Sequence, residues 1–528
     1  LLLFSCARVG APNGGTRDSL APKFLGSNID TTRLNVSRTV KELRLDFDEY
    51  VMLKDFNKNF NVSPPIKKIK KVIPSNLANK YVLIQWEDTL QANTTYNFNF
   101  GNAIVDNNES NPLPYFNFAF STGDKIDDLF VSGTVKDAMT LIKENQTAKD
   151  NKMVVGLYKA GENLDYKQKP DYITKVDEEN YFELNFLPKG EFVIIAFDDE
   201  NQNSVYDAGK EKVSFLKEKI TLDSTSVRGL KLKLYPSKKV VKYKESKAIN
   251  GGLLMTFEGN PETVEVKSLS EELKDFKVTH AKRSDSVNIW FDAEKSNLGG
   301  TVSKQVKLSY FTPTISDTIS VSYKAVKDEF KLSNEAGNLI APENNFVINT
   351  SLPIENLNTS SWKLESDSIA QDFTAKISEK NPFKILVNSS FKPTKKYVLT
   401  IPKETVSSYY SSNDKSFQFQ FEIDKPENYG SFTAVIKNKP TAKFWVELTN
   451  EKGEILYSQF TNASEVSFKN LKPATYIARI RVDNNGNGFW DEADFAQNIA
   501  AEDVYIFEKE INVRPLWEIK EDWELTNH

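Results

Sequence analysis

The dominant pattern in this chain is a two-residue alternation of apolar and polar positions. It recurs in short segments, for example KELRLDF (41–47), TYNFNFG (95–101), YFELNF (181–186), GLKLKLY (229–235) and SFQFQFEI (416–423). Successive side chains of a β-strand point to opposite faces of a sheet, so each segment predicts a strand with one buried face. Helical periodicity is scarce. The pattern therefore predicts an all-β protein made of tandem antiparallel β-sandwiches.

Length and charge narrow this picture. The chain has 528 residues, whereas single cores stop growing at about 250 to 300 residues, so we expect several domains. Its 68 basic and 73 acidic residues give a net charge of -5, which offers no general attraction for nucleic acid. No stretch approaches the roughly 18 consecutive apolar residues of a membrane-spanning helix. We expect a folded, multi-domain protein with no nucleic-acid partner.

Two distant segments repeat each other without a gap. They are LPKGEFVIIAFDDENQNSVYD (187–207) and LKPATYIARIRVDNNGNGFWD (471–491). Each places a leucine, an aromatic residue and an apolar strand before the pattern D-x-N-x-N-x-x-x-D. This match predicts two copies of one domain, each with an Asp/Asn loop after a buried strand.

The two loops present oxygen atoms at the spacing of an EF-hand-type calcium loop. The candidate ligands are Asp199, Asn201, Asn203, Asp207 and Glu211 in the first loop, and Asp483, Asn485, Asn487 and Asp491 in the second. Backbone carbonyls of Val205 and Phe489 would add to them. The second loop has Phe495 where the first has Glu211, with Asp494 beside it. Asn in place of Asp lowers the charge, so we expect weak binding, about 0.1 to 1 mM. The same residues also form metal-free turns, and this alternative stays open.

The only cysteine is Cys6, and the segment Leu3-Phe4-Ser5-Cys6 resembles the lipobox of bacterial lipoproteins. The resemblance implies that residues 1–5 are the remnant of a signal peptide and that Cys6 carries a lipid. Residues 6–21 would then be the lipidated cysteine followed by a flexible tether, since they are rich in glycine and lack a hydrophobic period. A free thiol in a frayed terminus is the alternative.

The order of segments resembles a family of Bacteroidota outer-membrane lipoproteins. The repeated segments resemble the transthyretin-like, or carboxypeptidase-regulatory-like, sandwich. TYNFNFG, together with FDEYVMLKD (47–55) and NVSPP (61–65), resembles the bacterial Ig-like domain first known from S-layer proteins. The implied domains are Ig-like at 22–124, transthyretin-like at 125–238, a β domain at 239–328, Ig-like at 329–424, transthyretin-like at 425–515, and an acidic C-terminal tail at 516–528, where we expect Trp517 and Trp523 to pack against the last domain.

Motifs for catalysis are missing. His280 and His528 are the only histidines, and the sequence has no G-x-S-x-G, H-E-x-x-H, C-x-x-C or phosphate-binding P-loop pattern. A pair of buried carboxylates stays open, because 73 acidic residues always offer some pair. We expect that the protein is not an enzyme.

The resemblance implies a non-catalytic lipoprotein of the outer membrane, exposed at the cell surface. It would act as a scaffold or accessory subunit of an envelope protein complex that holds a β-barrel and other lipoproteins, for example one that assembles or exports outer-membrane proteins. A surface adhesin or glycan-binding lipoprotein is the alternative. Tyr409 and Tyr410, in the polar segment SSYYSSND (407–414), are the candidate partner contacts. Equally, both rings can fold back on their own sandwich.

Overall fold

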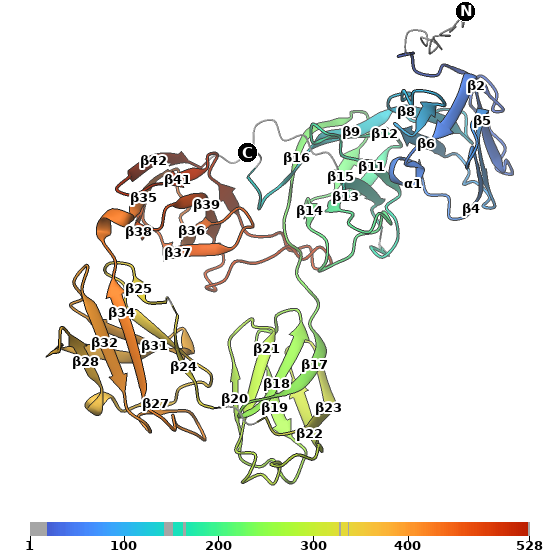
Figure 1. Ribbon diagram of the computed structural model, residues 1–528. Coiled ribbons are helices and arrows are strands. Elements are labelled where there is room, and N and C mark those ends of the chain that lie inside the picture. The colour runs from blue at the N-terminus through green and yellow to red at the C-terminus, as the bar shows by residue number, and fades with distance from the viewer. Residues whose placement is uncertain (1–17, 142–151, 162–164, 327–328, 336, 526–528) are drawn as a thin grey trace, which may run out of the picture. The chain divides into compact units, whose positions relative to one another are not determined.

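The computed structural model in Figure 1 describes residues 18–141, 152–161, 165–326, 329–335 and 337–525. Within these residues the chain forms 42 strands, one four-residue α-helix and two short 3-10 helices. None of the helices described has the length and apolar character needed to cross a membrane. The prediction of an all-β protein is confirmed.

The chain divides into two compact units. Unit 1 is Leu1–Ser237 together with Glu492–Ala501, and unit 2 is Lys238–Asp491 together with Glu502–His528. In the described part of the chain, unit 1 holds two β-sandwiches and unit 2 holds three, which we number from first to fifth along the sequence. Each sandwich has two facing sheets around a core of its own.

The first sandwich has sheets in the order β1-β2-β5-β4, with β7 beside β2, and β3-β6-β8. The alternation predicted for β6 is confirmed, because Phe98 and Phe100 are buried in the core, and Phe118 and Phe120 of β8 are buried in the same core. Its elements are β1 (Phe24–Ser27), β2 (Glu42–Leu53), α1 (Phe56–Asn59), β3 (Asn61–Ser63), β4 (Ile69–Ile73), β5 (Asn79–Trp86), β6 (Thr95–Gly101), β7 (Ile104–Asp106) and β8 (Phe116–Ser121).

The second sandwich has a smaller sheet, β12-β9-β16, and a larger sheet, β11-β10-β13-β14, with β15 also paired to β13. Strand β16 runs parallel to β9, whereas the other pairs are antiparallel. Its strands are β9 (Leu129–Asp137), β10 (Met153–Lys159), β11 (Tyr172–Lys175), β12 (Tyr181–Leu187), β13 (Gly190–Asp198), β14 (Val213–Phe215), β15 (Ile220–Leu222) and β16 (Val227–Leu234).

The third sandwich pairs a sheet β17-β18-β21-β20 with a sheet β19-β22-β23. Its core includes Leu253, Ile289, Leu308 and Tyr323, all of which are buried. Its strands are β17 (Lys242–Ile249), β18 (Gly252–Glu258), β19 (Glu265–Ser268), β20 (Lys277–His280), β21 (Ser286–Trp290), β22 (Lys304–Phe311) and β23 (Ser316–Tyr323).

The fourth sandwich pairs a sheet β24-β26-β31-β30 with a sheet β25-β34-β32-β28-β29, and β27 and β33 form a small ribbon. Its elements are β24 (Leu332–Asn334), β25 (Leu339–Ile340), β26 (Phe346–Thr350), β27 (Asn356–Leu357), η1 (Thr359–Ser361), β28 (Lys363–Ser366), β29 (Ile369–Ala370), β30 (Phe373–Ser378), β31 (Asn381–Ser389), β32 (Lys396–Ile401), β33 (Val406–Ser407) and β34 (Phe417–Ile423).

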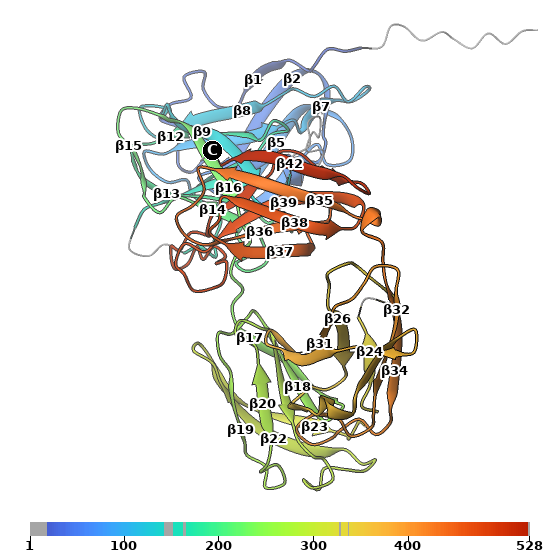
Figure 2. The ribbon, with the colours of Figure 1, turned by 90° about the vertical axis from the view of Figure 1, so that its left-hand side faces the viewer.

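The fifth sandwich follows the short helix η2 (Pro426–Asn428) and has a smaller sheet, β38-β35-β42, and a larger sheet, β37-β36-β39-β40, with β41 also paired to β39. Figure 2 shows β42 beside β35, to which it runs parallel. Its strands are β35 (Gly430–Lys437), β36 (Phe444–Thr449), β37 (Ile455–Thr461), β38 (Glu465–Leu471), β39 (Ala474–Val482), β40 (Val504–Ile506), β41 (Ile511–Val513) and β42 (Glu518–Glu524).

The second and fifth sandwiches therefore have the same strand order, including the parallel pair that closes the smaller sheet. This confirms the internal repeat seen in the sequence. The equivalence corrects one boundary: residues 518–524 form β42, the counterpart of β16, and are not an acidic tail beyond a domain that ends at residue 515. Trp523 lies in the core of the fifth sandwich at 4% exposure, whereas Trp517 is 48% exposed and lies beside Arg514.

Candidate functional site

The first Asp/Asn loop lies between β13 and β14 of the second sandwich. The Asp199 carboxylate accepts hydrogen bonds from the backbone N–H groups of Asn203 (3.0 Å) and Ser204 (3.1 Å). The amide oxygen of Asn201 also accepts a bond from Asn203 N–H (3.0 Å). These bonds fold the segment into a tight turn of the kind that Asn and Asp side chains form with their own backbone.

Glu211 closes the other side of the same loop. Its carboxylate accepts the N–H groups of Glu200 (3.1 Å) and Asp207 (2.8 Å). Asn201 Nδ2 donates to Asp207 Oδ2 (2.7 Å), so the structure does bring the predicted residues of this loop together. Each carboxylate oxygen has more than one acceptor site, so these bonds leave capacity for a further ligand.

The second loop repeats this network in the fifth sandwich. The Asp483 carboxylate accepts the N–H groups of Asn487 (3.0 Å) and Gly488 (2.9 Å). Asn485 and Asn487 both donate through Nδ2 to Asp491 Oδ2, at 2.5 Å and 2.8 Å. The four residues predicted for this loop therefore also lie together.

Glu502 completes the second loop, and the sequence pattern did not reveal it. Its carboxylate accepts the N–H groups of Asn485 (3.2 Å) and Asp491 (3.0 Å), as Glu211 does in the first loop. Glu502 stands two residues before β40, and Glu211 stands two residues before β14. Eleven positions separate Asp491 from Glu502, against four from Asp207 to Glu211, so a fixed spacing could not find it. Strand equivalence is the signal that would have done so.

Phe495, which has the same spacing from Asp483 as Glu211 has from Asp199, has another role. It belongs to unit 1, where it is buried in an apolar cluster, with its ring 4.3 Å from Tyr166, 5.9 Å from Tyr206 and 5.1 Å from Phe215. The neighbouring Asp494 side chain accepts the N–H of Gln497 (3.2 Å), so it serves its own turn.

The electrostatics of the two loops differ. In the first loop, burial raises the pKa of Glu211 to about 7 and also raises that of Asp199, although the latter accepts two N–H groups. In the second, burial likewise raises the pKa of Glu502. Asp491 behaves differently: burial opposes its charge, but hydrogen bonds from Asn485 and Arg283 outweigh it, so its pKa lies below the ordinary value.

Arg283 is a cation already bound to the second loop. Its Nη1 lies 2.7 Å from Asp491 Oδ1, its Nε lies 2.5 Å from Glu262, and its guanidinium sits 4.6 Å from the centre of the Phe489 ring. All of these residues belong to unit 2. The second loop is therefore partly neutralised by the protein itself.

Neither loop is a ready cluster of strong ligands. Among the described residues, no three His, Cys, Asp or Glu side chains meet in an arrangement that would hold a metal ion. An ion in either loop would have to use Asn amide oxygens and backbone carbonyls as well as carboxylates, which suits a hard cation such as calcium better than zinc.

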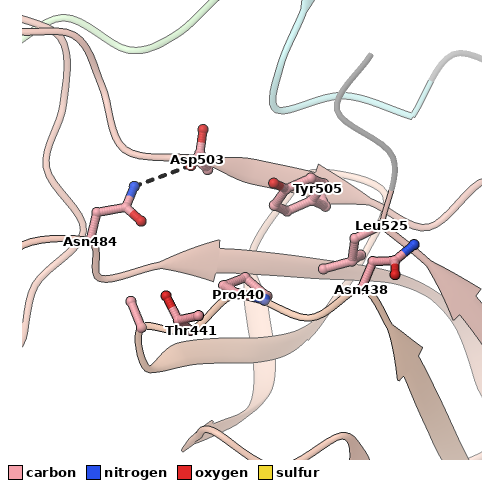
Figure 3. Close-up of a pocket in the computed structure, with 8 residues that line it drawn as sticks. Asn438, Pro440, Thr441, Asn484, Asp503, Tyr505 and Leu525 are labelled. Carbon is pink, nitrogen blue, oxygen red and sulfur yellow. Dashed lines mark hydrogen bonds between the residues drawn. The ribbon is translucent and has the colours of Figure 1, made fainter.

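A polar pocket of about 480 Å³ opens beside the second loop, at one end of the fifth sandwich. Figure 3 shows Tyr505 and Asp503 on one side and Pro440 and Thr441 across from them, with Asn484 bonded to Asp503 at the end. Burial raises the pKa of Tyr505, and the charge of Asp503 adds to the effect, so the phenol stays protonated at neutral pH. Asn484 also follows directly on Asp483 in the loop.

The remaining predicted residues are placed as follows. Tyr409 and Tyr410 are half-buried against the core of the fourth sandwich, and the Tyr410 hydroxyl donates to Asp275 (3.1 Å), so both rings fold back on unit 2. His280 lies in β20, with its Nε2 3.0 Å from the Ser284 carbonyl oxygen. Cys6 and His528 lie outside the described residues.

The fold and these sites define a protein of tandem β-sandwiches in which one sandwich type is repeated. Residues 18–122, which contain the first sandwich, match the bacterial Ig-like domain family, as expected for this part of the chain. A search of curated proteins found no match.

Solved structures give distant likenesses. They include surface layer protein SbsC, domains 1–6 (12% identity, 94% of this chain and 67% of that one, TM-score 0.16), a Bacteroides ovatus protein, SGBP-B, from a mixed-linkage glucan utilization locus (10%, 74% and 97%, 0.20), and BcpA, the major pilin subunit of Bacillus cereus (10%, 76% and 99%, 0.13). At these TM-scores the likenesses support no statement on function.

Proposed function

We propose that the protein is a non-catalytic scaffold that binds another protein of the cell envelope along strand β37 of the fifth sandwich. The single observation that carries this proposal is an unpaired sheet edge with exposed apolar side chains. In the described residues β37 pairs with β36 alone, so its other edge is open. Ile455, Leu456 and Phe460 on this strand are 45%, 49% and 44% exposed.

The composition of β37 supports a docking role. Natural edge strands usually carry lysine, proline or a bulge that discourages pairing with another chain. The segment ILYSQFT (455–461) has no charged residue and no proline, and its pairing with β36 is regular from Tyr457 to Thr461, with one bulge at Leu456. An edge of this kind suits β-augmentation, in which a partner adds a strand and its side chains fill alternate positions.

The equivalent edge of the second sandwich is already occupied. Strand β11, the counterpart of β37, lies beside β3 of the first sandwich in unit 1, and Ile173 N–H donates to Ser63 Oγ (3.2 Å) across this contact. A β-element therefore covers the edge of the earlier repeat. The same geometry favours a β-strand of a partner as the cover for β37.

Capture from native membranes tests this function. We expect gentle solubilisation and capture of the tagged protein to recover a stoichiometric envelope protein, with an outer-membrane β-barrel as the expected partner. Leu456→Lys should abolish recovery by placing a charge on the edge. Leu516→Lys, at an equally apolar site of 69% exposure in the same sandwich, is the matched control and should retain the partner. Recovery of the protein alone would sink the proposal.

The membrane anchor is a separate part of the proposal. We place the protein at the outer membrane, exposed at the cell surface, with a lipid on Cys6, because Leu3-Phe4-Ser5-Cys6 fits a lipobox. Two or three acyl chains hold a protein on a bilayer stably. Mass spectrometry of the N-terminal peptide from native membranes should find the acylated cysteine, and an unmodified thiol would contradict it.

Calcium is proposed as a weak structural ligand of the two Asp/Asn loops. Their matched hydrogen-bond networks, including Glu211 and its counterpart Glu502, place carboxylate and amide oxygens around each turn. The ion would stiffen the turn and would take no part in a reaction. A surface adhesin is the rival function, and the capture experiment separates it from the scaffold, because an adhesin would bind a glycan without a stoichiometric envelope partner.

A further inference from the structure

We propose that the pocket at the end of the fifth sandwich binds a neutral saccharide. This inference goes beyond the proposed scaffold, because the pocket is formed by the loop after β35, the segment after β39, the start of β40 and the residue after β42. None of the described residues that line it belongs to β37. The two sites can therefore be tested separately.

The size and the polar groups of the pocket suit a small polyhydroxyl ligand. Its volume of about 480 Å³ lies within the range of about 300 to 1,000 Å³ that is usual for ligand sites. Asn438, Thr441, Asn484 and Asp503 supply donors and acceptors from three different segments. Sugar hydroxyls both donate and accept, so they match amide, hydroxyl and carboxylate groups that converge on one space.

Two hydrogen bonds made by amide groups of the pocket are long. Asn484 Nδ2 lies 3.2 Å from Asp503 Oδ2, and Asn438 Nδ2 lies 3.4 Å from Glu524 Oε1. The usual N–H···O distance is about 2.9 to 3.0 Å. Weak internal bonds are readily exchanged for stronger bonds to a ligand, and a hydrogen bond to the Asp503 carboxylate gains from its charge.

Charge and apolar content narrow the class of ligand. Among the described residues that line the pocket, Asp503 alone is charged, so phosphates, sulfates and uronic acids would be repelled. Few apolar groups line the space, which disfavours a lipid. The Tyr505 ring and Leu525 offer an apolar side, with Pro440 across from them (Figure 3), and a pyranose has one face of C–H groups that packs well on such a side.

The equivalent place in the second sandwich has a different chemistry. The counterpart of Asp503 is Lys212, which forms a salt bridge with Asp137. The counterpart of Asn484 is Glu200, which forms a salt bridge with Lys152 (2.6 Å). Two ion pairs thus replace the hydrogen-bonded pair of Asn484 and Asp503. The pocket chemistry is a property of the fifth sandwich and is not imposed by the repeated fold.

The test is binding of defined sugars to the purified full chain in the presence of EDTA, which removes calcium from consideration. The probes are an array of neutral oligosaccharides of glucose, mannose, galactose and N-acetylglucosamine, and polygalacturonate as an anionic polymer. We expect binding to one or more neutral sugars and none to polygalacturonate. Asn484→Ala and Thr441→Ala should each weaken that binding about tenfold, since each removes at least one hydrogen bond to the ligand.

Two controls and one further pocket variant make the outcome decisive. Asp522→Asn changes an exposed carboxylate of the same sandwich that pairs with Lys437, outside the pocket, and should leave binding intact. Asn438→Gly removes the amide while the new residue still tolerates the φ of 55° at that position, so it should weaken binding without unfolding. An unchanged melting temperature confirms that each variant folds. No binding to any neutral sugar, preference for polygalacturonate, or binding that survives Asn484→Ala and Thr441→Ala would overturn the proposal.

Discussion

The second and fifth sandwiches share every strand and the Asp/Asn loop, yet the outer faces of their larger sheets are opposite in character. In the second sandwich this face is apolar. Val154, Ile195 and Phe197 are 3%, 0% and 0% exposed, and they form a cluster with Tyr206 and Phe495 inside unit 1. The sheet is therefore covered on both sides.

In the fifth sandwich the same face is ionic and aromatic. Strand register makes Trp445, Arg479 and Arg481 the counterparts of Val154, Ile195 and Phe197. Arg479 donates to Glu447 through Nε (2.9 Å) and Nη2 (2.7 Å), and Arg481 donates through Nη2 (2.5 Å). The Arg481 guanidinium also lies 5.9 Å from the Trp445 ring and 5.8 Å from the Trp490 ring.

One position shows why the two faces are not interchangeable. Gly156 stands where Glu447 does, and any side chain there would collide with Pro170, which packs directly over the strand. The inward positions of both sheets must fit the same core, but alternation leaves the outward positions free to change. A repeated sandwich can thus keep its framework and loop while one copy is covered by the chain and the other carries its own polar network.

The largest effect should come from breaking that network. Glu447→Ala would leave Arg479 and Arg481 without their partner at a site where Glu447 is 0% exposed, and removing one member of a buried ion pair costs about 3 to 5 kcal/mol. Hydrogen exchange of β36 and β39 in the full chain should show the loss. Glu465→Ala is the control, because its exposed pair with Lys520 (3.2 Å) contributes about 1 kcal/mol or less. Equal effects of the two variants would contradict the comparison.

The second-largest effect should come from Phe495, which covers the outer face of the larger sheet in the second sandwich. Phe495 is 4% exposed, and replacing a buried phenylalanine by alanine costs about 3 kcal/mol or more. Phe495→Ala should therefore weaken hydrogen-exchange protection in β13 and β14 of unit 1. Phe460→Ala, at 44% exposure in unit 2, is the matched control and should leave those strands unchanged. Unaltered protection in both variants would show that the apolar face does not need its cover.

The sequence predicted the inward half of this architecture well. Alternating segments such as TYNFNFG became strands with buried phenylalanines, and the gapless repeat became two equal sandwiches. It predicted less at positions whose burial or role depends on residues far away in the sequence. Glu447 reads as an outward polar residue, and only two arginines on the neighbouring strand explain its burial. Glu502 was hidden by a longer loop, and the charges of EIKEDWE (518–524) concealed the strand that Trp523 anchors.

Calcium should stabilise both sandwiches by binding to their Asp/Asn loops. Free ion at 100 times the dissociation constant would add about 2.7 kcal/mol per site, enough to raise the melting temperature by a few degrees. We expect calcium to stabilise the full chain in calorimetry. Glu211→Gln should remove the calcium-dependent stabilisation of unit 1, and Glu502→Gln should remove that of unit 2. Glu218→Gln, an exposed residue after β14, is the control. A melting profile that ignores both calcium and chelator would rule the ion out.

The smallest effect should come from removing Arg283, which should change the calcium affinity of the second loop alone. Arg283 occupies Asp491 Oδ1 at 2.7 Å, and the structure gives no such cation on Asp207 among its described contacts, so calcium must compete with a guanidinium only in the second loop. A partly exposed ion pair contributes about 1 kcal/mol or less, which corresponds to about fivefold in affinity. Arg283→Ala should therefore tighten calcium binding to the second loop up to about fivefold, measured by titration of the full chain carrying Glu211→Gln so that one site remains. Lys282→Ala removes a nearby cation that pairs with Glu262 (3.4 Å) and should change the affinity less. If both variants bind calcium as the parent does, the guanidinium does not compete for the loop, and the Arg283 contact makes no difference to calcium binding between the two repeats.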